Sequence, residues 1–299
     1  MLPLTLLTPI YNRATFVTQL YDTMKQQTKQ NFQWLVVDDG SSDHIKATME
    51  AIIDQNNSDL KITFIQKPNG GKHSALNYAH EHIEGQYTLV VDSDDLLYSN
   101  SVEKILTVLC DYKEDKSIGW IAFLRGTENG DYLDNPYPET FIETTYIDYL
   151  DMGRVGECCD VYQIEVFKKY PYPEIPNEHF VSESYLNIRA ALYGHYKMLM
   201  VNEVVQIGNY QNEGLTSQER SLQLKNPLGN AELWRPVVQK PFSLKMRLKG
   251  NLLYAVYSLF GDRALRQIIK NSLNKPLTIL CIPPVYMVYL FWKFQYREI

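Results

Sequence analysis

The sequence predicts an α/β protein, in which a mostly parallel, helix-covered sheet is followed by a basic, helical C-terminal region. Over the first 125 residues, short β-rich runs alternate with longer helical runs, and this spacing is typical of βαβ units. The chain of 299 residues is long enough for one large domain or two modest ones. Its composition, 45% hydrophobic and 21% charged, argues against a disordered, collagen-like or coiled-coil chain.

The expected elements follow one another closely in the first part of the chain. Strands are expected at residues 4–8, 32–37, 61–66, 87–91 and 118–124. The helices between them are expected at residues 15–27, 43–55, 72–83 and 99–112. The apolar N-terminus lacks a basic leader and a small-residue cleavage site, so it is interpreted as the first strand rather than as a signal peptide.

The second half of the chain is less regular. Residues 126–156 are turn-rich and acidic, and the run from 208 to 217 is typical of a loop. A strand running into a helix is expected at 159–167, a helix at 180–193 and a strand at 198–207. The four cysteines are scattered without C-x-x-C spacing, which favours reduced cytosolic thiols over a disulfide framework or a zinc site.

The net charge of −6 is unevenly distributed. Residues 235–299 contain 11 basic and 2 acidic residues, a net of +9, so residues 1–234 carry −15. A basic tail on an acidic body is typical of a tail that meets an anionic surface. The tail has no zinc-finger spacing and no aromatic strand pair of the kind that binds RNA, which argues against nucleic acid.

The basic residues of the tail flank the most apolar stretch of the chain, 277–292, which has no charge over sixteen residues. This is shorter than the roughly 20 residues of a spanning helix, and Pro283 and Pro284 are expected to break a helix there. Amphipathic aromatic residues favoured at the depth of lipid headgroups accompany the stretch: Tyr286, Tyr289, Trp292 and Tyr296. We therefore expect a segment that lies in one leaflet; the alternative is a helical hairpin packed on the protein's own core or on a second subunit.

Polar, turn-rich segments follow each of the first four strands, at residues 8–13, 38–43, 67–73 and 92–95. Parallel sheets bind ligands at the carboxyl ends of their strands, so these segments predict the site. Asp92 and Asp94 can both turn toward one divalent cation, because Mg²⁺ and Mn²⁺ take carboxylate oxygens and complete their shell with substrate phosphates. The structural alternative for this pair is a turn or a helix cap.

Asp38 and Asp39 follow an unbroken apolar strand, so one of the two carboxylates should face the ligand. We favour Asp39, which could accept a hydrogen bond from a base or a ribose hydroxyl; Ser41, Ser42 and Asp43 are candidates to cap the next helix.

The segment from Asn69 and Gly70 to Lys72 offers backbone N–H groups and a cation, a combination that suits an anion. It lacks the spacing of an ATP-type P-loop. The nearby His73, His80 and His82 are expected to be surface residues rather than metal ligands.

Glu183 begins a helical pattern beyond the sheet and is a candidate general base, although an acid in a first turn can simply favour the helix dipole. Glu178 and Glu157 are rival candidates for the same role.

Four of these segments, in order, resemble the family-two inverting glycosyltransferases of the GT-A fold. They are T-P-I-Y-N-R (8–13), V-V-D-D-G-S-S-D (36–43), K-P-N-G-G-K-H-S-A-L-N (67–77) and V-D-S-D-D (91–95). The resemblance is strong over residues 4–112 and fair to about residue 215. It implies a Rossmann-like nucleotide-binding mixed sheet, a nucleotide-sugar donor that is usually UDP-linked, a divalent metal held by the D-x-D element, and inversion at the anomeric carbon.

By position, the resemblance assigns a role to each matching residue. The nucleotide-binding set comprises Pro9, Tyr11, Arg13, Asp39, Asn69, Gly70, Lys72, Asp92 and Ser93. Asp94 is the main metal ligand, with Asp92 as the second. The family often places its base in an E-D pair ahead of a helix; here the place reads Ser182-Glu183-Ser184, so Glu183 is the match and the aspartate is absent.

The resulting domain prediction is a glycosyltransferase domain at 1–225, with a nucleotide-binding half at 1–112 and an acceptor half at 113–225, followed by the basic helical region at 226–299. The expected reaction moves a sugar, with Mn²⁺ or Mg²⁺, to a hydroxyl of a glycan or polyprenyl-diphosphate-linked acceptor in cell-surface polysaccharide synthesis. The expected location is cytoplasmic, on the inner face of the membrane, with a homodimer as the alternative use of the tail.

Two other functions remain open at this point. A nucleotidyltransferase also uses paired carboxylates and a metal, but it is expected to carry a glycine-rich basic loop after the first strand, and residues 8–13 are not one. A non-catalytic nucleotide- or carbohydrate-binding subunit would explain the missing aspartate of the E-D pair.

Overall fold

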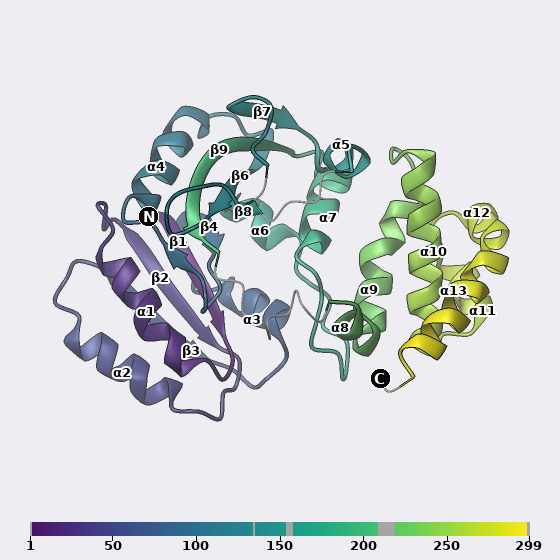
Figure 1. Ribbon diagram of the computed structural model, residues 1–299, viewed down its shortest axis with the longest axis horizontal. Helices are drawn as coiled ribbons and strands as arrows, with labels where there is room; N and C mark the ends of the chain where they lie inside the picture. The colour runs from purple at the N-terminus through teal and green to yellow at the C-terminus, as the bar shows by residue number, and fades with distance from the viewer. Residues whose placement is uncertain (1, 134, 154–157, 209–218, 298–299) are drawn as a thin grey trace. The chain divides into compact units, whose positions relative to one another are not determined.

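The computed structural model describes residues 2–133, 135–153, 158–208 and 219–297 (Figure 1). The chain forms two compact units. Unit 1 comprises Met1–Thr145, Val155–Pro171 and His195–Tyr210, and unit 2 comprises Tyr146–Arg154, Tyr172–Gly194 and Gln211–Ile299. The chain passes between these units several times before the C-terminal helices begin, and the domain boundary at residue 225 stays a prediction.

Unit 1 contains a mixed sheet in the order β3-β2-β1-β4-β8-β6-β9-β5, with β7 paired to β9. Strands β1 to β4 run parallel to one another, whereas β8 runs antiparallel to both β4 and β6. The strands are β1 (Leu2–Ile10), β2 (Phe32–Asp38), β3 (Lys61–Gln66), β4 (Gly85–Val90), β5 (Leu96–Leu97), β6 (Ile118–Gly126), β7 (Phe141–Thr144), β8 (Cys158–Gln163) and β9 (Lys197–Ile207). The mixed sheet flanked by helices is confirmed, but the sheet is not mostly parallel: β1 to β4 and the pair β6–β9 are parallel, whereas β8, β5 and β7 pair antiparallel with their neighbours.

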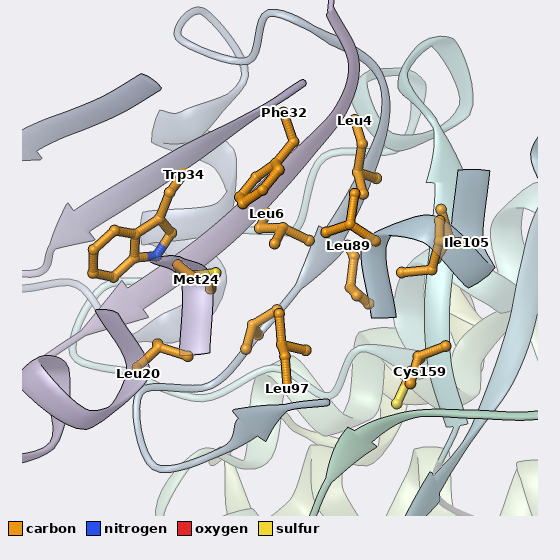
Figure 2. Packing of buried hydrophobic residues seen from close by; sticks show 14 of the residues in the cluster. Leu4, Leu6, Leu20, Met24, Phe32, Trp34, Leu89, Leu97, Ile105 and Cys159 are labelled. Atoms are coloured by element: carbon orange, nitrogen blue, oxygen red, sulfur yellow. The ribbon is translucent and has the colours of Figure 1, made fainter. Parts of the chain in front are cut away.

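Alternate residues of the strands face two helical layers. The largest core lies between one face of the sheet and helices α1, α2 and α4, and it includes Trp34, Leu6, Leu20 and Ile105 (Figure 2). Two further helices contact the same sheet: α3 packs on β1 and β2, and α6 packs on β4. The helices of unit 1 are α1 (Ala14–Lys25), α2 (Ile45–Gln55), α3 (Lys72–Ala79), α4 (Ser101–Tyr112) and α6 (Ile164–Lys169).

Every regular element among the described residues of unit 2 is a helix or a 3₁₀ turn. Its elements are α5 (Tyr146–Asp151), α7 (Ser184–Gly194), α8 (Glu219–Lys225), α9 (Pro227–Trp234), the 3₁₀ turn η2 (Arg235–Val238), α10 (Leu244–Phe260), α11 (Leu265–Asn271), α12 (Lys275–Leu280) and α13 (Ile282–Gln295). Helix α10 is the hub of this unit, since α9, α12 and α13 all pack against it. Its buried Tyr254 and Tyr257 lie in a second hydrophobic core.

Pro283 and Pro284 act differently from the prediction. They occupy the first turn of α13 and so begin a helix, a position where the missing N–H of proline costs no hydrogen bond. The break falls before them, at Cys281 between α12 and α13. In the described part of the chain, no helix has both the length and the hydropathy needed to cross a membrane.

Candidate active site

The carboxyl ends of β1, β2, β3 and β4 meet at one edge of the sheet. Ile10 lies opposite Asp38, which in turn lies opposite Gln66. The parallel pairing continues into the loops, where the N–H of Asp39 donates to the carbonyl of Ile10 at 2.9 Å and that of Val91 donates to Leu7 at 2.9 Å. The four polar segments predicted from the sequence are thus brought to the same edge.

Asp39 is buried, and its carboxylate organises the loop that follows β3. Lys67 Nζ lies 2.7 Å from Oδ1, and Asn69 Nδ2 donates to Oδ2 at 3.1 Å. The backbone N–H groups of Gly70 and Gly71 donate to the same carboxylate, at 3.0 Å to Oδ1 and 2.7 Å to Oδ2 respectively. These N–H groups, which the sequence offered as an anion site, are therefore bonded within the protein. The predicted contact of Asp39 with a base stays a prediction.

The turn after β2 is locked in a conformation that only glycine adopts easily. Gly40 has φ of +75°, and a Cβ there would lie 2.6 Å from the backbone nitrogen of Asn69. The neighbouring Asp38 accepts from the N–H of Ser41 and from Gln66 Nε2, both at 2.9 Å. The loops after β2 and β3 consequently form one hydrogen-bonded unit.

The loop after β1 is joined to the loop after β2. The backbone N–H of Asn12 donates to Ser41 Oγ at 2.8 Å, and Asn12 Oδ1 accepts from the N–H of Ser42 at 2.8 Å. Next to this junction, the Tyr11 side chain is 50% exposed, while the Arg13 guanidinium lies over the ring of Phe16 at 5.3 Å. Pro9 is buried at the end of the strand, so Tyr11 is the member of this predicted set that is best placed to meet a ligand.

The acidic turn after β4 separates its carboxylates into two environments. Asp92 and Asp94 are partly exposed, whereas Ser93 and Asp95 are buried. Asp92 Oδ1 lies 2.5 Å from Lys72 Nζ, at the start of α3. Asp94 has no hydrogen bond or ion pair with any residue that the structure describes. Two predicted nucleotide contacts, Lys72 and Asp92, are thus paired, and the carboxylate beside them is open to a ligand.

Asp95 anchors this turn to two other strands, and sequence reasoning gave it no role. Its carboxylate pairs with Arg125 of β6 and accepts from Gln206 Nε2 of β9 at 2.5 Å. Its backbone N–H donates to the carbonyl of Asp92 at 3.1 Å. Burial raises the pKa of Asp95 to about 7, although the charge of Arg125 opposes this shift. The feature of the sequence that could have indicated this anchoring role is the third acidic residue of D-S-D-D, which directly precedes an apolar pair.

The donor set of the turn suits a hard divalent cation. Carboxylate oxygens are the ligands that Mg²⁺ and Mn²⁺ take, with the rest of the shell supplied by water and substrate phosphates. Across the described ranges, no three His, Cys, Asp or Glu side chains gather as a metal-binding group. One open carboxylate, Asp94, with Asp92 next to it therefore fits a metal that arrives with a diphosphate better than a closed protein cage.

The histidines near α3 are less exposed than the sequence suggested, although His80 and His82 are only half-buried. His73 is buried. His80 packs edge-on against Phe167 with ring centroids 5.2 Å apart, and burial, followed by the charge of Lys168, lowers its pKa to about 4. The ring of His80, just after α3, thus contributes to packing against α6.

The candidate bases lie in unit 2. Glu183 is exposed, in the turn directly before α7. The carboxylate of Glu178 is buried, and accepts from the N–H groups of Leu228 and Gly229 at 2.7 and 2.6 Å at the start of α9. Both oxygens of Glu178 are therefore used in holding α9, which argues against it as a base, and Glu157 lies outside the described residues.

Comparison with protein families decides the classification. The model described as Glycosyl transferase family 2 matches residues 5–170, more than half of the chain. The chain belongs to glycosyl transferase family 2. The match covers all four strand-end segments and ends near the close of α6, so the acidic turn and the Asp39 loop are part of the family domain.

Two curated relatives of this family-2 chain each match less than half of its length. An uncharacterized glycosyltransferase of Rickettsia bellii is 32% identical over 136 residues, 46% of this chain and 19% of the relative. A teichoic acid poly(glycerol phosphate) polymerase of Staphylococcus epidermidis is 31% identical over 99 residues, 33% of this chain and 14% of the relative. The aligned parts are thus less than a fifth of the length of these two relatives.

Solved structures match over almost the whole chain. Residues 1–349 of TarS from S. aureus, in complex with UDP-GlcNAc, give a TM-score of 0.63 at 15% identity, covering 95% of this chain and 80% of that one. The mannosyltransferase PcManGT from Pyrobaculum calidifontis, in complex with GDP-Man and Mn²⁺, gives 0.59 at 15% identity, covering 100% and 88%. At this identity the likeness shows the fold, and the predicted GT-A fold is confirmed.

Proposed function

We propose that this chain is an inverting, metal-dependent glycosyltransferase that moves a sugar from a nucleoside-diphosphate donor, most simply a UDP-sugar, to a hydroxyl group. The observation that carries the proposal is the acidic turn after β4, where Asp94 is open to a ligand beside the paired Lys72 and Asp92. Family membership and the donors and Mn²⁺ named for the two similar structures support it.

The donor's diphosphate would bind at the acidic turn. A divalent cation bound there would neutralise the diphosphate and stabilise it as a leaving group. Lys72 would contribute a second positive charge by turning from Asp92 toward the phosphates. The exposed ring of Tyr11 would contact the base, and the loop organised by Asp39 would form the adjoining wall.

Glu183 would be the general base. Its carboxylate would take the proton of the acceptor hydroxyl as the hydroxyl oxygen attacks the anomeric carbon, and the bond from that carbon to the phosphate oxygen would break on the opposite side. The proton ends on Glu183 and the electron pair of the broken bond on the nucleoside diphosphate. Glu183 is an exposed residue in the turn directly before α7.

The acceptor class that we favour is a growing cell-surface glycan or a polyprenyl-diphosphate-linked glycan, met at the cytoplasmic face of the membrane. The relative named as a teichoic acid polymerase supports a role in building a surface polymer. A non-catalytic binding subunit is the second candidate, because the aspartate of the family's E-D pair is replaced by Ser184.

A donor-turnover assay separates these two functions. Purified protein with Mn²⁺ is expected to release nucleoside diphosphate from UDP-GlcNAc, GDP-Man or a related donor, slowly with water and faster with an acceptor glycan. Glu183→Gln should reduce acceptor-dependent release by about 10²–10⁴-fold and leave donor binding intact, whereas the equally exposed Glu174→Gln in the same unit should retain activity. Donor binding without turnover of any donor would favour the binding subunit.

A further inference from the structure

Helices α12 and α13 of unit 2 present an unusually apolar surface, here called the outer apolar face. Phe294 is 74% exposed, Leu280 71% and Met287 68%. The face consists of Ile279, Leu280, Pro283, Pro284, Tyr286, Met287, Leu290, Phe291 and Phe294, all of them exposed. Single exposed hydrophobic residues are ordinary, but nine of them gathered on two consecutive short helices indicate an interaction site.

The outer apolar face is distinct from the side of α13 that packs on the protein. Val285, Val288, Trp292 and Tyr296, which recur at helical spacing, belong to the core formed with α10. Trp292 contacts Tyr257 with ring centroids 5.8 Å apart. Helix α13 is therefore apolar on both sides, a pattern expected of a helix with a second apolar environment. At fourteen residues, α13 is too short to span a bilayer.

The charges around this face have a single sign. Residues 263–297 contain six basic and no acidic residues. Three of them are exposed and form no ion pair within the part of the chain that the structure describes: Lys275 at the start of α12, Lys293 in the last turn of α13, and Arg297 just after α13. Arg263, by contrast, is paired with Glu232 at 3.1 Å.

We propose that the outer apolar face docks on an anionic lipid surface, with α13 lying in the plane of the headgroups. Its apolar side chains would enter the boundary of the acyl chains while Lys275, Lys293 and Arg297 meet lipid phosphates. Charge complementarity favours this occupant over a second copy of the chain, because a two-fold contact through the face would bring its own basic residues together. The proposal does not rest on sugar transfer.

Vesicle cosedimentation of the purified full chain tests the proposal without donor or acceptor. The chain is expected to bind vesicles that contain phosphatidylglycerol and to bind pure phosphatidylcholine vesicles much less. Replacing Met287, Phe291 and Phe294 together with Ser should weaken binding by at least about tenfold. The matched control replaces Met152, Leu244 and Leu248, three exposed apolar residues of the same unit, with Ser and should bind as the wild type does.

A second pair of variants tests the charges. Replacing Lys293 and Arg297 with Gln should weaken binding about fivefold per residue, whereas replacing the exposed Lys113 and Lys116 of unit 1 with Gln should not. Circular dichroism and thermal unfolding verify that each variant is folded. Absence of binding to phosphatidylglycerol vesicles, or undiminished binding by the Met287, Phe291 and Phe294 variant, would overturn the proposal. A dimer in analytical ultracentrifugation that this variant converts to a monomer, without vesicle binding by the wild type, would assign the face to a second copy.

Discussion

Two acidic segments follow β2 and β4, the parallel strands on either side of β1 in unit 1, and they are built in opposite ways. After β2, the Asp39 carboxylate is buried and accepts from Lys67, Asn69, Gly70 and Gly71. After β4, Asp94 is partly exposed and has no hydrogen bond or ion pair to another described residue. Both segments looked alike in the sequence, as aspartates at strand ends.

The difference shows that a carboxylate at a strand end can have a structural role, holding a loop in place, or a binding role, contacting a ligand. A buried carboxylate that is fully hydrogen-bonded has little capacity left for a ligand, and removing it leaves its donors unsatisfied. A partly exposed carboxylate without partners costs little to remove and can bind a cation. Substitutions in the first segment should therefore act on stability, and substitutions in the second should act on chemistry.

The largest effect is expected from Asp94→Asn. Loss of the open carboxylate should lower metal-dependent sugar transfer by roughly 10³-fold, because a metal contributes several kcal/mol of charge stabilisation. The unfolding temperature should stay the same or rise slightly, since Asp94 repels the buried Asp95. Initial rates of nucleoside diphosphate release, together with thermal unfolding, measure both. A large loss of stability would mean that Asp94 is structural.

Asp39→Asn should show the reverse pattern. It removes the charge that faces Lys67 in a buried pair and weakens the bonds to Gly70 and Gly71, so the free energy of unfolding should fall by about 3 kcal/mol. Urea unfolding measures the change. The control is Asp43→Asn, whose exposed carboxylate accepts from the N–H groups of Ala14 and Ile45, with an expected cost of about 1 kcal/mol. Equal losses of unfolding free energy at the two positions would mean that the buried Asp39 carboxylate contributes no more to stability than an exposed one.

Gly40→Ala tests the backbone conformation of the loop after β2. The positive φ of Gly40 and the 2.6 Å approach of a Cβ to the backbone nitrogen of Asn69 predict a loss of about 1–3 kcal/mol. Gly130 also has a positive φ, but nothing lies within 4 Å of its Cβ position, so Gly130→Ala should cost less. Urea unfolding of both variants separates backbone strain from the clash, and an equal cost would show that the clash is relieved.

The smallest effect lies outside both segments, at His80. Because its pKa is lowered to about 4 in the folded protein, the unfolded chain binds more protons between about pH 4 and 6.5. The free energy of unfolding should therefore decrease as the pH falls through this window. His80→Gln should reduce that pH dependence, as measured by urea unfolding at several pH values; an identical slope in both proteins would mean that folding leaves the pKa of His80 unchanged.

The strand-helix alternation made most of unit 1 predictable. The strand expected at 61–66 has those bounds in the structure, and the helices expected at 43–55 and 99–112 end where predicted. The antiparallel strand β8 between β4 and β6 was not predicted as such, because residue patterns identify strands but not their neighbours. The two-residue β5 and the short edge strand β7 are too brief to give a periodic signal.

The candidate site was predictable at the level of segments rather than of single roles. The order of four polar strand ends identified the edge of the sheet that carries the site. The role of Asp95 depends on Arg125 and Gln206, which lie 30 and 111 residues away along the chain, and no local pattern links them. Similarly, the sequence could not show that Asp39 is surrounded by donors from its own protein.

Isothermal titration calorimetry of UDP binding, with and without Mn²⁺, tests the central claim most directly when wild type and Asp94→Asn are compared. GDP, dTDP and CDP are measured in parallel, because the base of the donor is part of the proposal. The account predicts that one nucleotide binds the wild type only with Mn²⁺, and that Asp94→Asn removes this dependence along with most of the affinity. Two results would contradict it: every nucleotide binds the wild type equally well without Mn²⁺, or Asp94→Asn binds nucleotide as the wild type does.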